Sequence, residues 1–476
     1  MNSETAKLTN FQIDSLHGRP QIISLPLVNN QLILVGENGT GKSTVVNILC
    51  YLLTQQWHRI SEFKFDSLKV EASGEVVELT RDDIETLDTN HAGSFSRDIA
   101  RNFPPNILRR AYAMLGDEFV PFDDLTDSAV DKFSDIARIP RSLAKRMLEE
   151  SLENRSSKLK KPLLEQIKRL QAWKFGQFLY LPTYRRIEQD LKSIFRGIEI
   201  EEKVREFRER FRKRERTSFI ELVEFGMEDV EKTIQSRMAQ IKESVRTGLS
   251  TLTGTYLREV IRGLNDKPDI SVLRSIDPTS FQSMFARIDE QTLPTADKLL
   301  LQTKIKEISQ GSGLGPDDKV IAHFLSKLVV LYKEQRTSES DVRDFVDLCN
   351  LYLTGKQFVY DDAEYEIYIE LTQPEPFSGK GQNKLPLRVL SSGEKQIVSL
   401  FSHMYLSGER DFFLVIDEPE LSLSVPWQQR FLPDIVSSGR CTGIVAVTHS
   451  PFIWENDLEP RVLSLAEHIR DKNDIH

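Results

Sequence analysis

The chain has few cysteines and no long apolar run, and each absence excludes certain classes of protein. Its 476 residues include only Cys50, Cys349 and Cys441, which are too few and too far apart for a disulfide framework or a zinc site. No apolar stretch approaches the roughly 20 residues of a membrane-spanning helix. The first residues, MNSETAKLTNFQ, lack the basic start and apolar centre of a signal peptide. We therefore expect a cytoplasmic protein that does not span a membrane.

An excess of positive charge is also missing. The formal net charge of -9 argues against a protein that coats nucleic acid by bulk attraction. Positive residues outnumber negative ones locally over residues 138–174, and any DNA contact is expected to be local. That segment is the best candidate for a nucleic-acid or acidic-partner surface, although charge runs are more often solvated faces.

The segment ILVGENGTGKSTVVNIL, residues 33–49, carries the pattern of a phosphate-binding loop between a strand and a helix. Glycines let backbone N–H groups point at phosphates, Lys42 reaches the β and γ oxygens, and Ser43 can bind magnesium. A glycine-rich turn without a ligand is the disfavoured alternative, because the flanking strand and helix match the motif. We expect ATP and Mg²⁺ as ligands, with contacts from Gly36, Glu37, Asn38, Gly39, Thr40, Gly41, Lys42, Ser43 and Thr44.

Two apolar runs near the other end of the chain predict buried parallel strands. Residues 412–416 precede Asp417 and Glu418, and the run GIVAV precedes Thr448 and His449. Carboxyl ends of parallel strands are where open α/β sheets bind ligands. We expect Asp417 to hold magnesium, Glu418 to orient or deprotonate the attacking water, and His449 to sense the γ-phosphate.

With the segment LSSGEKQ, these motifs resemble those of ABC-type ATPases, in particular the soluble branch of SMC, RecF and OLD-like proteins. Ser391 stands at the signature serine, Ser392 and Gly393 at the glycine pair, and Glu394 where transporters usually carry glutamine. The resemblance implies that this signature acts in trans on the nucleotide of a second head. A plain helix cap is the alternative interpretation of the segment.

Two features depart from that family. Ser424 stands near the position where the family carries an Asp or His. A glutamine-bearing loop cannot be assigned, and the segment Thr183, Tyr184, Arg185 and Arg186 is our candidate for a loop that approaches the nucleotide or the neighbouring head. Surface ion pairing is the alternative role of its arginines.

The predicted fold is α/β, an ABC-type P-loop ATPase head with a mixed parallel sheet, an antiparallel lobe and helical insertions. Residues 1–82 and 356–476 are assigned to the head, 176–190 to a strand and loop returning to it, and 83–175 and 191–355 to helical insertions. Apolar residues spaced about 3.67 apart, from Phe219 to Leu252, predict one long helix. It is expected to form a short coiled-coil-like arm with a helix near residues 320–332 or 342–353.

The segments LYLPTYRRIE, LSSGEKQIVSLFSH and IDEPELSLSVPWQ resemble stand-alone ATPase subunits of bacterial anti-phage systems, such as AriA of PARIS and PtuA of Septu and retron systems. That resemblance implies a homo-oligomer built through its heads, a separate nuclease effector and a phage trigger protein. We expect no nuclease activity in this chain, because adjacent carboxylates such as Asp361 and Asp362 more often cap turns. A RecF-like DNA-repair ATPase is the alternative, and a transporter motor fits least.

Overall fold

The computed structural model describes residues 5–37, 39–91, 130–131, 134, 139–146, 149, 160–182, 219–221, 227–263, 269–274, 277–288, 290, 293–309, 316–373 and 384–472. The chain forms two compact units, which we call the first unit (Met1–Glu224 with Arg410–His476) and the second unit (Phe225–Glu409). This division differs from the predicted boundaries, because residues 356–409 lie with the helices of the second unit.

A six-stranded parallel sheet lies in the first unit. In spatial order its strands are β12 (Val462–Ser464), β3 (Gln31–Val35), β11 (Cys441–Val447), β10 (Phe412–Asp417), β6 (Gln177–Leu181) and β7 (Phe219–Glu221). Each neighbouring pair is parallel. Every residue of β10 is buried, as expected for a strand covered on both faces. The strands predicted before Pro182, before Glu418 and before Thr448 are confirmed.

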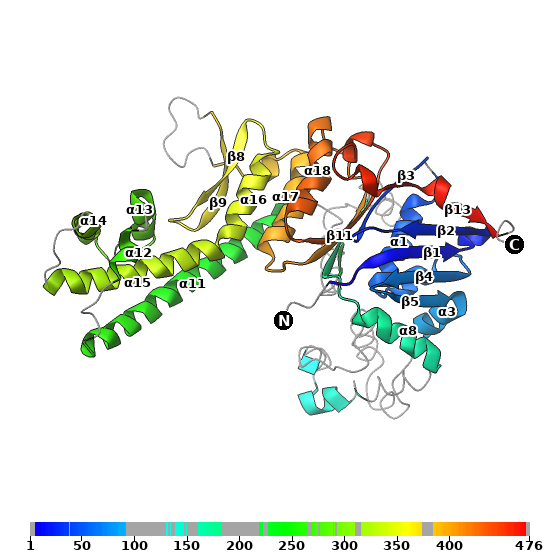
Figure 1. Ribbon diagram of the computed structural model, residues 1–476, viewed down its shortest axis with the longest axis horizontal. Coiled ribbons are helices and arrows are strands. Elements are labelled where there is room, and N and C mark those ends of the chain that lie inside the picture. Colours follow the sequence, from blue (N-terminus) through cyan, green and yellow to red (C-terminus); the bar gives the residue numbers. More distant parts are fainter. Residues whose placement is uncertain are drawn as a thin grey trace, which may run out of the picture. The chain divides into compact units, whose positions relative to one another are not determined.

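The second sheet of the first unit is antiparallel, and Figure 1 shows its strands side by side. Their order is β13 (Ile469–Asp471), β2 (Gln21–Pro26), β1 (Leu8–Asp14), β4 (Ser67–Ala72) and β5 (Glu75–Thr80). Buried and more exposed residues alternate along β4, as they do when only one face of a sheet is covered. The predicted antiparallel lobe is confirmed. The predicted α/β fold class is confirmed as well.

The helices of the first unit cover these sheets. They are α1 (Lys42–Leu53), α2 (Trp57–Ser61), α3 (Arg81–His91), α8 (Lys161–Ala172) and α18 (Val425–Ser437), with short 3-10 helices η1 (Leu16–Gly18), η4 (Pro451–Ile453), η5 (Glu459–Arg461) and η6 (Leu465–His468). Helix α1 is buried along nearly its whole length, and its apolar side chains share one core with both sheets. A helix whose residues are mostly buried and apolar belongs inside a protein, and α1 is such a helix.

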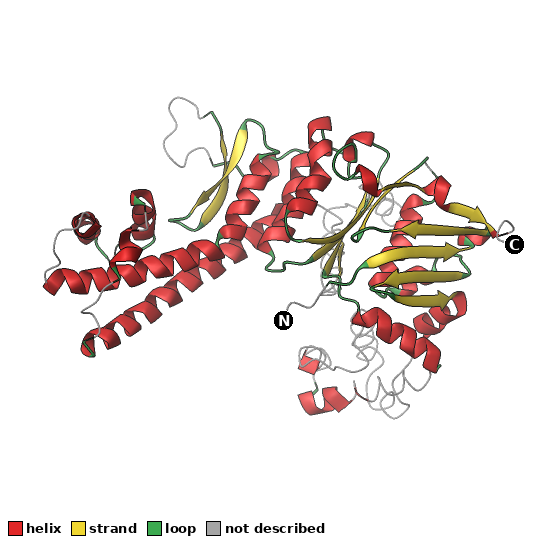
Figure 2. Ribbon diagram, viewed as in Figure 1, coloured by secondary structure: helices red, strands yellow, loops and turns green. Residues whose placement is uncertain are grey.

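The second unit is mainly helical (Figure 2). Its helices are α11 (Met227–Ile261), α12 (Ile270–Arg274), α13 (Pro278–Ala286), α14 (Thr295–Ser309), α15 (Pro316–Ser338), α16 (Ser340–Asn350), η3 (Leu387–Val389) and α17 (Ser392–Leu406). Strands β8 (Lys356–Asp361) and β9 (Glu366–Leu371) form an antiparallel pair. Residues 374–383, which follow β9, lie outside the described residues.

The predicted long helix is confirmed from Met227 onward as α11, which packs against α15 and α17. Figures 1 and 2 show α11 and α15 side by side. They approach closely at Gly248, where a Cβ atom would lie 2.9 Å from a methyl carbon of Leu331. The predicted start was wrong, because Phe219 belongs to strand β7 and pairs in parallel with Phe178.

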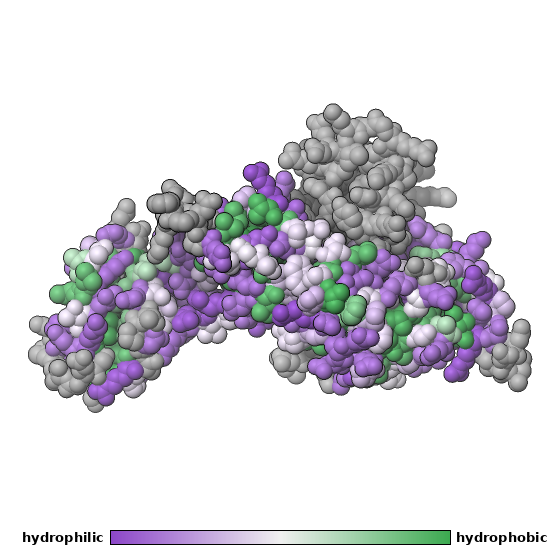
Figure 3. Space-filling model, turned by 90° about the horizontal axis from the view of Figure 1, so that it is seen from above, coloured by the Kyte–Doolittle hydropathy of each residue, from purple (hydrophilic) through white to green (hydrophobic). Residues whose placement is uncertain are grey.

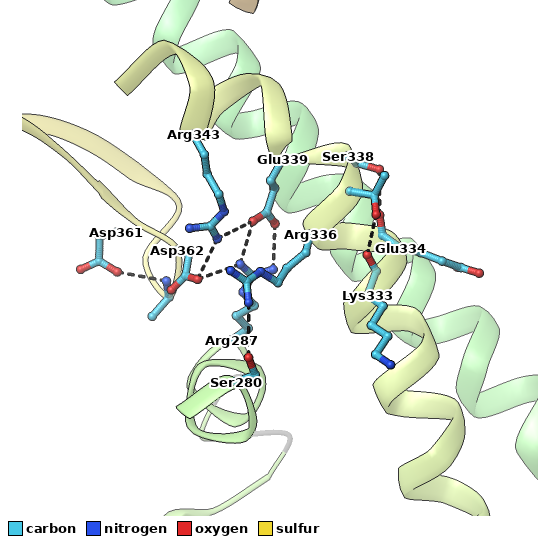
Figure 4. A network of polar contacts seen from close by, with 12 residues as sticks. Ser280, Arg287, Lys333, Glu334, Arg336, Ser338, Glu339, Arg343, Asp361 and Asp362 are labelled. Atoms are coloured by element: carbon cyan, nitrogen blue, oxygen red, sulfur yellow. Dashed lines mark hydrogen bonds and ion pairs between the residues drawn. The ribbon is translucent and has the colours of Figure 1, made fainter. Parts of the chain in front are cut away.

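A cluster of charged side chains surrounds the buried pair Arg287 and Glu339 in the second unit (Figure 4). The Arg287 guanidinium donates to both carboxylate oxygens of Glu339, at 2.7 and 2.8 Å, and to Asp362 at 3.1 Å. Arg343 donates to the same Asp362 oxygen at 3.1 Å. The cluster joins the end of α13, the start of α16 and the turn between β8 and β9.

The surface carries mixed polarity. On the face shown in Figure 3, hydrophilic and hydrophobic residues of the described part are interspersed. Among the helices of the described ranges, none combines the length and the apolar character that crossing a bilayer requires.

Candidate functional site

Three neighbouring parallel strands bring Asp417, Glu418 and His449 to the edge of the six-stranded sheet where the phosphate loop begins. Strand β3 leads into the phosphate loop, β10 ends on Asp417, and β11 leads into Thr448. Strand β11 lies between the other two. The Thr448 N–H donates to the Leu34 carbonyl at 3.2 Å, and the Glu418 N–H donates to the Val447 carbonyl at 2.8 Å. These bonds hold the three strand ends in register where open α/β sheets bind ligands.

The phosphate loop, residues 36–44, folds back before helix α1. Gly39 (φ 79°) and Gly41 (φ 96°) take left-handed conformations that other residues rarely adopt. Lys42 is a buried residue, and its ammonium group donates to the carbonyl oxygens of Gly36 and Glu37, both at 2.8 Å. Burial lowers the pKa of Lys42, while nearby carboxylates act in the opposite direction. Asn38, another predicted contact, lies outside the described residues.

Ser43 and Asp417, the two residues expected to hold magnesium, lie in contact. The Ser43 hydroxyl donates to the Asp417 carboxylate at 2.9 Å, although the residues lie on α1 and β10 and are far apart in sequence. Hydroxyl and carboxylate oxygens are ligands that Mg²⁺ prefers, and such sites keep several waters or substrate oxygens. This pair of donors therefore fits a magnesium ion held between the loop and the sheet.

Glu418 lies at a bend directly after β10. Its backbone has φ 53°, a left-handed conformation that costs a non-glycine residue free energy and is concentrated at functional sites. Partial burial raises the pKa of its carboxyl group, and the charges of Asp417 and Glu420 raise it further. His449 and Lys42 act in the opposite direction on that pKa. Glu418 therefore shares one electrostatic site with the phosphate-loop lysine and the predicted sensor histidine.

Glu420 is a further residue of this site, beyond those predicted from the sequence. One carboxylate oxygen of Glu420 accepts the backbone N–H of His449, and the other accepts the hydroxyl of Thr448, both at 2.8 Å. Thr448 is fully buried, whereas His449 is exposed. A carboxylate just past one strand end, with a Thr-His pair just past the next, was the available signal.

A second missed contact anchors helix α1. The Tyr180 hydroxyl of β6 donates to the side-chain oxygen of Asn47 at 2.7 Å, in the buried core. Buried polar groups need such partners, so this bond fixes the rotation of α1 against the sheet. The helix that follows the phosphate-loop glycines is therefore fixed to the sheet.

The signature residues Ser391, Ser392 and Gly393 lie in the second unit, at the start of α17. The Ser391 hydroxyl accepts the Glu394 N–H at 3.4 Å, and the Glu394 carboxylate accepts the Ser391 N–H at 2.7 Å. This capping box matches the helix cap that was the alternative interpretation, and a helix N-terminus also suits an anion. Action in trans therefore stays a prediction. The candidate loop Thr183 to Arg186 lies outside the described residues.

Lys356 lies next to this helix start. Its ammonium group is 2.9 Å from the Glu394 carboxylate, and both side chains are largely buried. The Lys356 ammonium thereby neutralises the negative charge of Glu394. Without Lys356, that charge would oppose the attraction of the helix N-terminus for another anion.

Comparison with solved structures finds distant similarity to SMC head domains. One is the Pyrococcus furiosus Smc head with an extended coiled coil, bound to the C-terminal domain of ScpA: 11% identity, 94% of this chain and 91% of that chain, TM-score 0.32. An SmcHead bound to the C-winged helix domain of ScpA has 10% identity, 94% and 90% coverage and TM-score 0.32. A Pyrococcus yayanosii Smc head with coiled coil and joint has 15% identity, 94% and 93% coverage and TM-score 0.30.

No curated protein matches the chain at a significant level. A family model does match, and it is described as the AAA ATPase domain. The match extends over residues 17–454, which include the phosphate loop, both strand ends and the signature segment. The chain belongs to this family of ATPase domains.

Proposed function

We propose that the chain is an ATP-driven switch that works as a homo-oligomer and controls a separate nuclease effector in a bacterial anti-phage defence system. The observation that carries the ATPase part is the Ser43–Asp417 hydrogen bond of 2.9 Å, with Glu418 next in the chain. It joins a phosphate loop, a metal-binding pair and a carboxylate in one place. Resemblance of the motif segments to stand-alone defence ATPases supports the choice of biological role.

The chain's own residues suit phosphoryl transfer to water. Lys42 can exchange the carbonyl oxygens of Gly36 and Glu37 for phosphate oxygens of ATP. Ser43 and Asp417 would hold Mg²⁺, which neutralises charge on the β and γ phosphates when bound. Glu418 would orient and deprotonate the attacking water, and His449 would contact the γ-phosphate from the next strand end.

The first test measures ATP turnover by the purified protein with and without duplex DNA, together with its solution mass with and without ATP. We expect turnover that ignores DNA, and an oligomer that co-purifies with a nuclease when both are produced together. Turnover accelerated several-fold by DNA would instead support a RecF-like or SMC-like repair ATPase. Absence of turnover under all these conditions would contradict hydrolysis itself.

The described part of the basic segment, residues 138–174, gives limited support to the alternative of a DNA-repair ATPase. Arg141 is paired with Asp131 at 2.7 Å, and Lys145 lies 4.0 Å from Glu149. Pairing of exposed charges of this kind is typical of a solvated face. DNA binding therefore ranks below the switch role, as the second candidate function.

Lys42→Ala is expected to weaken ATP binding by about 10- to 100-fold, because a hydrogen bond to a charged group contributes about 1.5–3 kcal/mol. Equilibrium binding of a fluorescent ATP analogue measures this loss. Lys69→Ala is the matched control, since Lys69 makes only a surface ion pair with Glu71 at 3.1 Å. Equal affinity in the Lys42 and Lys69 variants would exclude the phosphate loop as the nucleotide site.

Ser391→Arg is expected to abolish ATP turnover while each chain still binds ATP, because a bulky side chain at the start of α17 blocks its approach to the nucleotide of a second head. Ser407→Arg places the same side chain at the other end of the same helix and serves as the control. Steady-state turnover and ATP binding are measured for both. Normal turnover in the Ser391 variant would contradict action in trans.

A further inference from the structure

Glu420 joins two turns that follow neighbouring strands of the parallel sheet. It lies between β10 and α18, yet its carboxylate accepts both the His449 N–H and the Thr448 hydroxyl from the turn after β11, each at 2.8 Å. Hydrogen bonds to an ionised acceptor are stronger than those between neutral groups. Thr448 is fully buried, so water cannot easily replace its partner.

The turn after β11 is held by further bonds from the same side. The Ser450 N–H donates to the Thr448 hydroxyl oxygen at 3.0 Å, and the Ser450 hydroxyl donates to the Gln428 amide oxygen at 2.6 Å. Gln428 lies on α18 and donates its amide N–H to the Leu423 carbonyl at 2.9 Å. Residues 448–450 are therefore fixed through backbone and short side chains, while the His449 ring stays exposed.

We propose that Glu420 is a positioning residue, whose carboxylate fixes the backbone of His449 so that the exposed imidazole is held at the γ-phosphate end of the site. This inference rests on the proposed ATPase function. A flexible turn would let the ring sample many positions, and a displacement of about 1 Å can cost about 100-fold in rate. Glu420 touches neither substrate nor metal in this role and acts through His449.

The experiment compares Glu420→Ala and Glu420→Gln with the parent, with Glu455→Ala as the control for loss of an exposed carboxylate in the same region. Hydrogen exchange of the peptide over residues 448–453 reports the turn directly, and that over residues 441–447 reports the strand. Turnover gives kcat and KM, and equilibrium binding gives the ATP affinity. Thr448→Val removes one of the two bonds and replaces Glu420→Ala if that variant does not fold.

In Glu420→Ala we expect exchange of residues 448–453 to rise by about tenfold or more, while residues 441–447 stay protected. We expect kcat to fall by about 10- to 100-fold with ATP affinity changed less than about twofold. Glu420→Gln should recover most of both losses. Its amide oxygen can accept the His449 N–H, and its amide N–H can donate to the Thr448 hydroxyl oxygen.

Three results would overturn the inference. Unchanged exchange in residues 448–453 would show that the carboxylate does not fix the turn. Raised exchange with normal kcat would show that ATP turnover does not require the His449 ring to be held in one position. Faster exchange over the whole first unit, with normal turnover per folded molecule, would show a purely structural role. If the parent itself lacks turnover, the ATPase proposal fails, whereas the exchange comparison still decides whether Glu420 fixes the turn.

Discussion

Glu418→Gln is expected to lower ATP turnover by about 10²- to 10⁴-fold, the usual contribution of a general base. Glutamine has nearly the same shape as glutamate, so the bend at φ 53° and the Glu418 N–H bond to Val447 should persist. ATP binding should not weaken, because the change removes one negative charge beside Asp417 and Glu420. Bound ATP and paired heads are therefore expected to accumulate.

Single-turnover kinetics, equilibrium ATP binding and solution mass with ATP measure these expectations. Glu455→Gln, the same change at an exposed position of the same unit, is the control and should behave as the parent does. Equal turnover in the Glu418 variant and the parent would contradict its assignment as the base. Loss of ATP binding along with turnover would show instead that the bend, rather than the chemistry, depends on the carboxylate.

The strands that carry these residues could be predicted from sequence because buried parallel strands are continuous apolar runs. Strands β10 and β11 are such runs, and each is followed at once by polar residues. Since parallel strands end at the same edge of a sheet, topology alone predicts that Asp417 and His449 lie at the edge where the phosphate loop begins. The phosphate loop could also be predicted, because its glycine and lysine spacing is a local sequence pattern.

The start of the long helix could not be predicted in the same way. Phe219 continues the apolar spacing of α11 by coincidence, but it lies in β7 and its ring stacks on Tyr180 with ring centroids 6.5 Å apart. A short apolar segment suits a strand or a helix, and pairing with β6 decides between them. That pairing is with a segment about 40 residues earlier in the chain, so the local sequence pattern does not indicate it.

Hydrogen-bond and ion-pair partners that are distant in sequence could not be predicted either. Asp361 caps a turn as predicted, accepting the N–H groups of Ala363 and Glu364 at 3.0 and 3.1 Å. Its neighbour Asp362 instead pairs with Arg287, 75 residues earlier in the chain. The spacing of residues cannot show which carboxylate finds such a partner, because the packing of several elements decides it.

Glu339→Ala is expected to destabilise the second unit by about 3–5 kcal/mol, the usual cost of removing one partner of a buried ion pair. The Glu339 side chain is 0% exposed and that of Arg287 2% exposed, and they share two hydrogen bonds (Figure 4). After the change, the buried guanidinium would keep only the partly exposed Asp362 as an acidic partner within this cluster.

The tryptophans allow this loss to be assigned to one unit. All four, Trp57, Trp173, Trp427 and Trp454, lie in the first unit, so their fluorescence reports its unfolding. Far-UV circular dichroism also reports the helices of the second unit. In urea, Glu339→Ala should lower the midpoint of the dichroism transition and leave the fluorescence midpoint in place. Glu243→Ala, which removes an exposed ion pair with Arg246, should leave both midpoints unchanged.

Replacing both partners distinguishes the cost of a stranded charge from the loss of packing. In the double variant Arg287→Met with Glu339→Leu, the core no longer contains an unpaired guanidinium, and we expect at least half of the lost stability to return. If the double variant is as unstable as Glu339→Ala, the ion pair is needed for the geometry of this region rather than for charge balance. Asp362 and Arg343 would then lack the partner that orders the turn between β8 and β9.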